Sequence, residues 1–385
     1  MRVMSENNHL LADSETQIED RLSVATQRQL MWWRFKKHKL ALFSLIIVLL
    51  FYGIALGAEF MATSDPRDGR SARAVVPPQP VYTFDKGVFR LHVCGIKGER
   101  DEYTLQKTYK QDCSQKVDIK FFARGYEYKF LGLLPMDRHL LGVSDPDAYR
   151  AKEWIFLLGT DTQGRDLYSR ILFGTRSSLT TGLVGVIMSL SLGVVLGGVS
   201  GFFGGVVDNV IQRTIEIIRS IPTIPLWMGL AAAMPPDWSI LRIYFAITII
   251  ISLFAWTDLA RVVRGRFLAM REEDFVTAAI VAGANWRDVI FRHMVPSFYS
   301  HLIASATLAI PFMIISETAL SFLGLGLRPP AISWGVLLQA AQNVQAIALT
   351  PWLMFPAIPV IVIILALNFM GDGLRDAADP YSAVE

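Results

Sequence analysis

The chain has 385 residues, of which 52% are hydrophobic and only 18% are charged. Soluble domains average about 25% charged residues, and the deficit here is concentrated in several long uncharged runs. This distribution excludes an ordinary soluble protein and predicts an all-α integral membrane protein. The net charge of +3 decides little by itself, and we expect no nucleic acid among the partners.

Residues 1–39 form a predicted cytoplasmic segment, polar at first and basic at its end. Residues 1–30 carry mixed charge and are expected to be loosely ordered. Residues 30–39 interleave tryptophans with lysines and arginines, as in a helix lying at the lipid headgroups or in a plain basic flank of the next span. A first transmembrane helix is predicted at 40–60, because residues 40–58 hold no charge and roughly 20 apolar residues cross a bilayer. It begins too late for a cleaved signal peptide and reads as an uncleaved anchor.

Residues 61–154 form a hydrophilic insertion that we expect outside the membrane, in the periplasm. Alternation predicts a β-hairpin from 81–84 and 88–93 around a turn at 85–87, and a second from 117–122 and 126–131, broken at Gly125. The chain has two cysteines, Cys94 and Cys113, and both lie here. In an oxidising compartment such a pair predicts a disulfide. Zinc binding with the nearby His92 is the alternative, although no CxxC motif is present, and we expect no metal.

Residues 155–385 are predicted to form the main transmembrane domain with five further spans. They lie at 177–207, 221–236, 243–257, 295–316 and 351–370. The two short runs at 221–236 and 243–257 read as a helical hairpin that crosses the membrane and returns; a buried pair of core helices is the alternative. The second span carries glycines four residues apart, which allow close helix approach in lipid, within this chain or against a partner: Gly193, Gly197, Gly201 and Gly205.

The placement of basic residues predicts the orientation. Four of them crowd the start of the first span, and six arginines lie between residues 261 and 292. Under the positive-inside rule both segments are cytoplasmic, and six spans return the C-terminus to the same side. The predicted location is a bacterial inner membrane, crossed several times, with both termini in the cytoplasm.

The segment 261–297 between the fourth and fifth spans reads as a cytoplasmic loop with two short helices separated at Gly283. Phe275, Ala279 and Ala282 share one narrow apolar face, and Asn285 is a candidate N-cap of the second helix. Such a helix suits docking into a groove of another protein. An inert helix lying at the membrane surface is the alternative from the residues alone.

Three stretches of the chain resemble a known family. They contain LGTDTQGRD at 158–166, EDFVTAAIVAG at 273–283 followed by His293 and Pro296, and ETALSFLGLG at 317–326. The middle stretch resembles the EAA loop of ABC importer permeases, and together they resemble the C-type second membrane subunit of the dipeptide/oligopeptide (Dpp/Opp) family. Thr277 stands where this loop usually has glutamate, so no role that depends on that carboxylate is carried over.

The resemblance implies a type I ABC importer permease fold that moves short peptides or a related small solute. It implies a sister permease subunit, two ATPase subunits that bind ATP and Mg, a periplasmic solute-binding protein, and the lipid bilayer as partners. This chain itself would hold no cofactor and no catalytic residue. Its ATPase-coupling residues would be Asp274, Phe275, Thr277, Ala278, Ala279, Gly283, Trp286, Arg292, His293 and Pro296.

Two charged residues near the spans have open roles. Glu317 could line the translocation path, or it could cap a helix or pair with Arg328; Asp258 is expected at the membrane interface. Gly159 and Gly164 mimic a phosphate-binding loop, but the required lysine and Ser/Thr are missing, so the chain is not expected to bind ATP.

Two other functions compete with the importer. One is a membrane-anchored enzyme or sensor that works through the external insertion, which however lacks clustered metal ligands and a nucleophile motif. The other is an ion-coupled secondary transporter, which the absence of detectable internal repeats disfavours.

Overall fold

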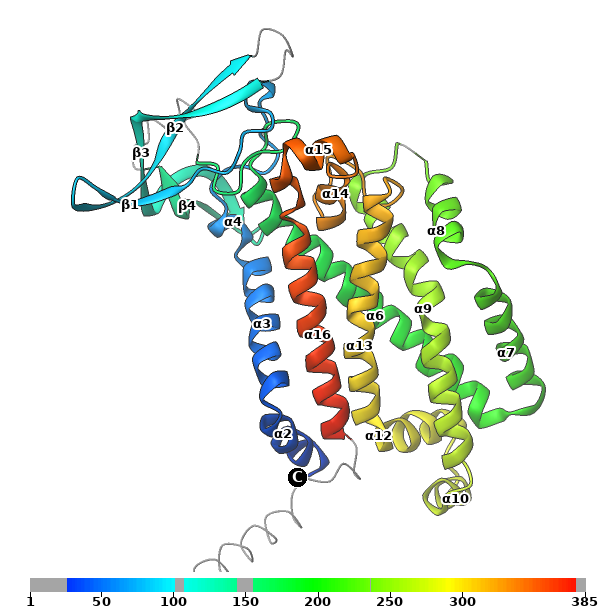
Figure 1. The fold of residues 1–385 in the computed structure, drawn as a ribbon. Coiled ribbons are helices and arrows are strands. Elements are labelled where there is room, and N and C mark those ends of the chain that lie inside the picture. Colours follow the sequence, from blue (N-terminus) through cyan, green and yellow to red (C-terminus); the bar gives the residue numbers. More distant parts are fainter. Residues whose placement is uncertain (1–25, 101–106, 144–154, 236, 379–385) are drawn as a thin grey trace, which may run out of the picture.

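The computed structural model describes residues 26–100, 107–143, 155–235 and 237–378. Among these, five helices are long and apolar enough to cross a membrane, and a bent pair brings the total to as many as six. A four-stranded antiparallel sheet stands at one end of this helical bundle (Figure 1). The structure therefore confirms the predicted helical membrane fold with a small β-rich insertion.

The N-terminal part begins with α2, Gln27–Lys37, which leads almost directly into the first span, α3, Lys39–Leu56. A single turn, α4, Ala58–Met61, then ends the span, and a short turn η1 follows at Ser71–Arg73. The part of residues 1–30 that was expected to be loosely ordered lies largely outside the described residues.

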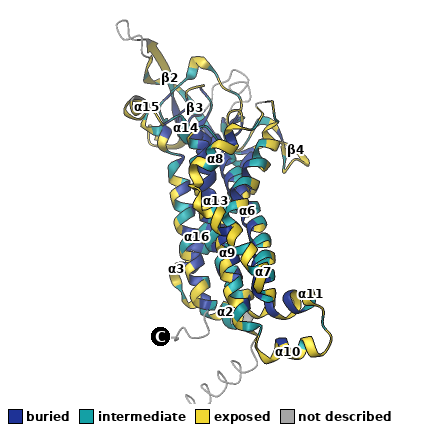
Figure 2. Cartoon of the chain, turned by 90° about the vertical axis from the view of Figure 1, so that its right-hand side faces the viewer, coloured by how far each residue is buried: buried dark blue, intermediate teal, exposed yellow. Residues whose placement is uncertain are grey.

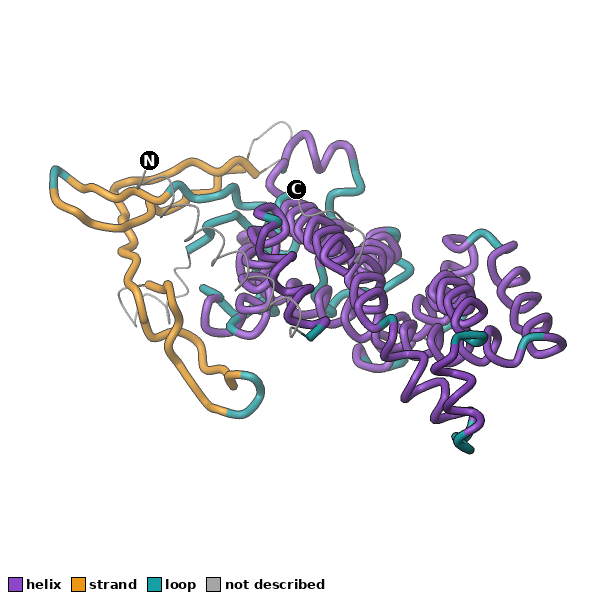
Figure 3. The backbone as a smooth tube through the Cα atoms, turned by 90° about the horizontal axis from the view of Figure 1, so that it is seen from below, coloured by secondary structure: helices purple, strands orange, loops and turns teal. Residues whose placement is uncertain are grey.

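The insertion is a meander in the order β1-β2-β3-β4: Val81–Asp85, Val88–Arg100, Lys107–Phe130 and Leu134–Val143. The predicted β1–β2 hairpin is confirmed, with Asp85 opposite Val88. The predicted second hairpin is wrong, because 117–122 and 126–131 lie almost entirely in the single long strand β3. That strand pairs with β4 instead, and the irregularity near Gly125 is a register shift between Arg124 and Tyr128. Seen from below, the strands lie to one side of the helices (Figure 3).

The second span, α6, Leu167–Phe203, is followed by the bent pair α7, Gly205–Ser220, and α8, Thr223–Ala232. The two helices meet at 83°, so the third span is broken, and it starts at Gly205 instead of at residue 221 as predicted. The fourth span, α9, Ile240–Met270, runs well past the predicted end at residue 257. The bent pair lies at the edge of the bundle farthest from α3 (Figure 1).

The loop between the fourth and fifth spans contains α10, Asp274–Val281, then α11, Trp286–Asp288, a π-helical turn η2 at Val289–Met294, and α12, Val295–Ser297. The fifth span is α13, Tyr299–Phe322. Short turns α14, Trp334–Gln339, α15, Val344–Leu349, and η3, Pro351–Met354, precede the last span, α16, Ala357–Ala378. Helix α10 lies at the opposite end of the bundle from the sheet, at the same end as α2 (Figure 1).

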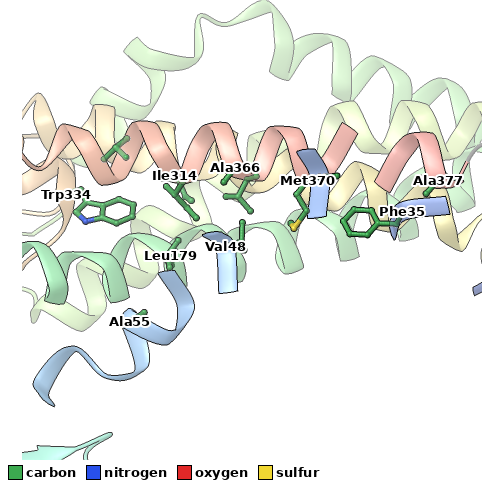
Figure 4. Close-up of a cluster of buried hydrophobic side chains, with 13 residues drawn as sticks. Phe35, Val48, Ala55, Leu179, Ile314, Trp334, Ala366, Met370 and Ala377 are labelled. Carbon is green, nitrogen blue, oxygen red and sulfur yellow. The ribbon is translucent and has the colours of Figure 1, made fainter. Parts of the chain in front are cut away.

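The bundle is held together by apolar residues between the helices. In Figure 4, Val48 of α3, Leu179 of α6, Ile314 of α13 and Ala366 of α16 meet in one buried cluster, with Trp334 at one end of it. The outward faces of the same helices remain exposed (Figure 2). Exposed apolar faces on long helices are expected where lipid, and not water, surrounds the protein.

Candidate functional site

The loop between α9 and α13 folds as two helical pieces with a left-handed residue between them. Helix α10 ends at Val281, and Gly283 has φ of +85°, a conformation that glycine adopts without steric cost. Asn285 lies at the N-cap position of α11, but its side chain makes no capping hydrogen bond there. The predicted break at Gly283 is therefore present. Asn285 occupies the predicted N-cap position, but its side chain does not cap the helix.

The inner side of α10 packs against the rest of the chain. Val276 is fully buried in a cluster with Val263 and Phe267 of α9 and Ile290 of η2, and Ala279 lies against the same cluster. The predicted apolar face of Phe275, Ala279 and Ala282 is thus divided. Ala279 faces the protein, whereas the other two face outward.

The outer side of α10 and the turn after it expose apolar side chains. Val281 is 82% exposed, and Phe275, Ile280, Trp286 and Phe291 are exposed as well. The ring of Trp286 also contacts Phe203 of α6, with 5.6 Å between the ring centroids. The remaining predicted coupling residues are also exposed: Asp274, Thr277, Ala278, Gly283, Arg292, His293 and Pro296. Sequence reasoning missed Ile280, Val281 and Phe291, which a simple list of large apolar residues beside Phe275 would have included.

A polar network fixes the C-terminal end of α9, from which this loop starts. The guanidinium of Arg264 donates to both carboxylate oxygens of Asp208 on α7, each at 2.5 Å. The hydroxyl of Ser200 on α6 donates to the same carboxylate at 2.5 Å. The start of the loop is therefore tied to the turn between α6 and α7.

The glycines of α6 lie where this helix crosses α9. A side chain at Gly193 would meet Leu259, one at Gly197 would meet the backbone of Ala260, and one at Gly201 would meet Phe267. These glycines therefore allow close packing of α6 against α9 within this chain. Gly205 does not belong to this face, because the chain turns at Gly204 (φ +64°) and Gly205 begins α7.

Glu317 is fully buried within the subunit. Its carboxylate accepts hydrogen bonds from Ser321, at 2.8 Å, and from Ser178 of α6, at 3.4 Å. The predicted pairing with Arg328 is wrong, since the Arg328 side chain donates to the carbonyl of Gly324. These contacts place Glu317 among the polar groups that join α6 to α13, and its position on the solute path stays a prediction.

The LGTDTQGRD stretch anchors the segment after α4 onto the start of α6. The carboxylate of Asp166 accepts from the hydroxyls of Thr63, at 2.9 Å, and Ser169, at 2.5 Å. Asp161 accepts from the Arg165 guanidinium at 2.7 Å. These contacts hold the segment after α4 against the start of α6.

The β insertion carries the predicted disulfide between Cys94 and Cys113. His92 does not join it; its ring Nδ1 contacts the carbonyl oxygen of Arg90 at 2.8 Å. Among the described residues no cluster of three or more His, Cys, Asp or Glu side chains could hold a metal ion.

Comparison with known sequences matches two families. Residues 193–382 match the binding-protein-dependent transport system inner membrane component, and residues 26–78 match the N-terminal transmembrane domain of oligopeptide transport permease C. The stretch between them, which contains the β insertion, lies outside both matches.

Curated relatives carry related names. The oligopeptide transport system permease protein OppC of Haemophilus influenzae is 38% identical over 229 residues, covering 59% of this chain and 71% of the relative. OppC of Escherichia coli K12 is 40% identical over 223 residues, 58% of this chain and 71% of the relative. The glutathione transport system permease protein GsiD of Pectobacterium atrosepticum is 35% identical over 224 residues, 58% of this chain and 72% of the relative.

Proposed function

Because this chain belongs to the family of binding-protein-dependent transport inner membrane components, we propose that it is one of two channel-forming subunits of an ATP-driven importer. Its solute is a short peptide or a related small molecule, delivered from outside by a binding protein. The names of the relatives, which carry oligopeptides or glutathione, favour a peptide. The partners are a sister permease and two ATPase subunits, and those ATPase subunits bind ATP and Mg.

The observation that carries the proposal is the two-sided structure of α10. Its inner side is fixed by Val276 and Ala279, so the helix has a defined orientation, and its outer side presents Phe275, Ile280 and Val281 uncovered. A rigid short helix with one exposed apolar side suits a groove on another protein. The docking surface is the set Phe275, Ala278, Ile280, Val281 and Trp286.

The placement of charge supports a cytoplasmic position for this surface. Arg261, Arg266 and Arg271 lie on or just after the end of α9 that leads into α10. Helix α2, with Lys36 and Lys37, lies at the same end of the bundle (Figure 1). Since basic residues favour the cytoplasmic side, both ends of the chain and α10 are assigned to the cytoplasm and the β insertion to the periplasm.

The domain assignment follows from these positions. Residues 1–39 form the cytoplasmic N-terminal segment, 40–60 the first span, 61–154 the periplasmic insertion and 155–385 the permease domain with its coupling loop at 261–297. The chain carries no chemistry of its own in this assignment. It supplies a gated path and a surface through which ATP hydrolysis is coupled to that path.

The test separates the two sides of α10. In the complete transporter, Val281→Asp places a carboxylate on the docking surface, which must lose its hydration when the ATPase binds. We expect the ATPase subunits to be lost on purification, while the permease pair keeps its thermal stability. Val281→Ala, which stays apolar, is the matched control and should retain them.

Ala279→Asp is the contrasting variant, because its carboxylate would face the Phe267 cluster inside the chain. Coupling should again fail, but with a lower melting temperature of the permease itself. If Val281→Asp and Phe275→Asp both kept stoichiometric ATPase and normal peptide uptake, α10 would not be the docking element.

A further inference from the structure

Two adjoining cavities lie where the third span breaks. The larger, of about 300 Å³, is bounded by α6, α9 and α13. The smaller, of about 160 Å³, is bounded by the α7–α8 bend together with α9 and α13. They share Ala255, Asp258 and Phe312 in their walls.

These cavities lie within the membrane layer. Along α13, their lining extends from Ser305 to Phe312, which is roughly 9 to 20 Å from the helix start at Tyr299 for a rise of 1.5 Å per residue. The hydrocarbon layer is about 30 Å thick. Asp258, expected at the membrane surface, borders this space near the end of the apolar part of α9, since Arg261 and Arg264 follow it within two turns.

The smaller cavity is lined by a pair of opposite charges. The guanidinium of Arg219, near the end of α7, donates to the carboxylate of Asp258 on α9. Their side chains are 40% and 76% exposed in this chain. Charges at membrane depth are stable only when they face other protein groups or a water-filled path. The pair, exposed as it is, marks the side of the bundle along which a polar solute could pass.

The same cavity contains a hydrogen-bond donor that lacks an acceptor. Trp227 of α8 is buried, it lines the cavity, and its indole N–H has no hydrogen-bond partner among the described residues. Buried tryptophan N–H groups normally have one. Thr223 and Thr257 also line this cavity. A ligand with a carbonyl or carboxylate oxygen would satisfy the indole.

The helices are interrupted and sharply bent at this point. Helices α7 and α8 are separated at Ile221 and Pro222 and bent by 83°, with Arg219 directly before the break. In many transporters, broken spans of this kind form the solute site near the middle of the membrane.

We propose that the α7–α8 break, with Arg219, Trp227 and Asp258, is a solute-binding site on the translocation path that recognises the two charged ends of a short peptide. The peptide carboxylate takes the place of Asp258 on Arg219, its ammonium group pairs with the released Asp258, and Trp227 donates to a peptide oxygen. The empty site stays neutral because the two side chains neutralise each other. This inference rests on the proposed function, since it names the part of the permease that meets the solute.

The test uses the complete transporter in proteoliposomes with its binding protein, and a tripeptide that this binding protein retains from a defined library. We expect Asp258→Asn, Arg219→Gln and Trp227→Phe each to lower maximal tripeptide uptake at least tenfold. The binding-protein concentration for half-maximal uptake should not change, because docking from outside is untouched. The matched control is Arg213→Gln, which breaks an exposed pair with Glu216 on the same helix α7 and should remain within twofold of wild type.

A second readout tests contact with the solute directly. Both native cysteines of this chain are bonded to each other, so Asp258→Cys provides a single free thiol in this chain, and the wild-type complex gives the background labelling of the other subunits. A water-soluble methanethiosulfonate should label it in the assembled transporter, and the tripeptide delivered by the binding protein should slow labelling at least threefold. Leu253→Cys, on an exposed apolar position of the same helix, should label slowly whether or not peptide is present.

The outcomes separate this inference from the proposed function. The site assignment is wrong if wild type imports the tripeptide, the maximal uptake by Trp227→Phe and Asp258→Asn stays within twofold of wild type, and the tripeptide does not slow labelling of the Asp258→Cys thiol. If the charge variants fail to assemble with the ATPases, the uptake by Trp227→Phe tests the site by itself, because this variant removes one N–H group and no charge. If the assembled wild type imports no peptide at all, the proposed function fails first.

Discussion

In the helical bundle, side chains such as Phe267 and Ile290 are enclosed between helices, whereas in the β insertion about half of the residues of the long strand β3 are exposed. The bundle gains its stability from close packing of apolar side chains between helices, because each buried side chain makes many favourable van der Waals contacts. The insertion has a small apolar cluster that includes Val93, Ile119 and Val143, and it is further held by strand pairing, one disulfide and ion pairs at its surface such as Lys97–Asp112. Exposed ion pairs contribute little each.

This difference indicates how each region tolerates change. Close packing leaves little room for an added atom, so single substitutions in the bundle carry a large cost. The insertion can lose a surface contact with small effect, and the disulfide is its covalent constraint. It also lies outside the two matched families, which fits a region whose sequence is less constrained by the permease fold.

The expected effects differ in how much of the molecule they reach, and the widest is in the bundle, where overpacking acts on the whole permease pair. Gly197→Ala would drive a methyl group into the backbone of Ala260, and we expect overpacking to cost about 1–3 kcal/mol of stability. Gly265→Ala, on the opposing helix α9, is the matched control because an added methyl group there meets no atom within 4 Å. Alanine is the better helix former, so the control should be neutral or stabilising by up to about 1 kcal/mol. Thermal unfolding of the purified permease pair measures both, and equal melting temperatures would contradict the packing role of the α6 glycines.

An intermediate effect is expected from the disulfide. Its cysteines are 19 residues apart, and closing a loop of this size stabilises a fold by about 3 kcal/mol in the chain-entropy model. Replacing Cys94 and Cys113 together by serine should increase protease cleavage of the insertion and lower the amount of protein in the membrane. Transport per molecule should survive. A variant as protease-resistant as wild type would show that strand pairing alone holds the insertion.

The smallest effect concerns acid. Lys97, together with the hydroxyl and N–H of Ser114, lowers the pKa of Asp112 from its ordinary 3.8 to about 2. A carboxyl whose pKa is lowered by folding stabilises the folded state above its ordinary pKa, and this contribution is lost as the pH falls from 3.8 toward 2. Pepsin cleavage of the insertion should therefore rise over this interval in wild type. In Asp112→Asn the rise should be weaker, and an identical pH profile would contradict the assignment.

The sequence alone determined the features that depend on local pattern. The length of the uncharged runs predicted the spans around 40–58, 295–316 and 351–370, because a helix of about 20 apolar residues is long enough to cross a bilayer. The turn at 85–87 predicted the first hairpin, and two cysteines in one polar insertion predicted their bond. Gly283 predicted the break after α10, since only the local backbone conformation is at issue there.

The tertiary structure decided which partner each local element meets. The apolar residues of α10 could face inward or outward, and only the position of Phe267 and Ile290 shows that Ala279 packs inside while Phe275 is free. The stretches 117–122 and 126–131 could pair with each other or form one strand, and pairing with β4 decided it. Arg219 and Asp258 are 39 residues apart in the chain and meet because α7 packs beside α9. Periodicity shows which residues share a side of an element, but the contact energy that selects a partner depends on the whole packed arrangement.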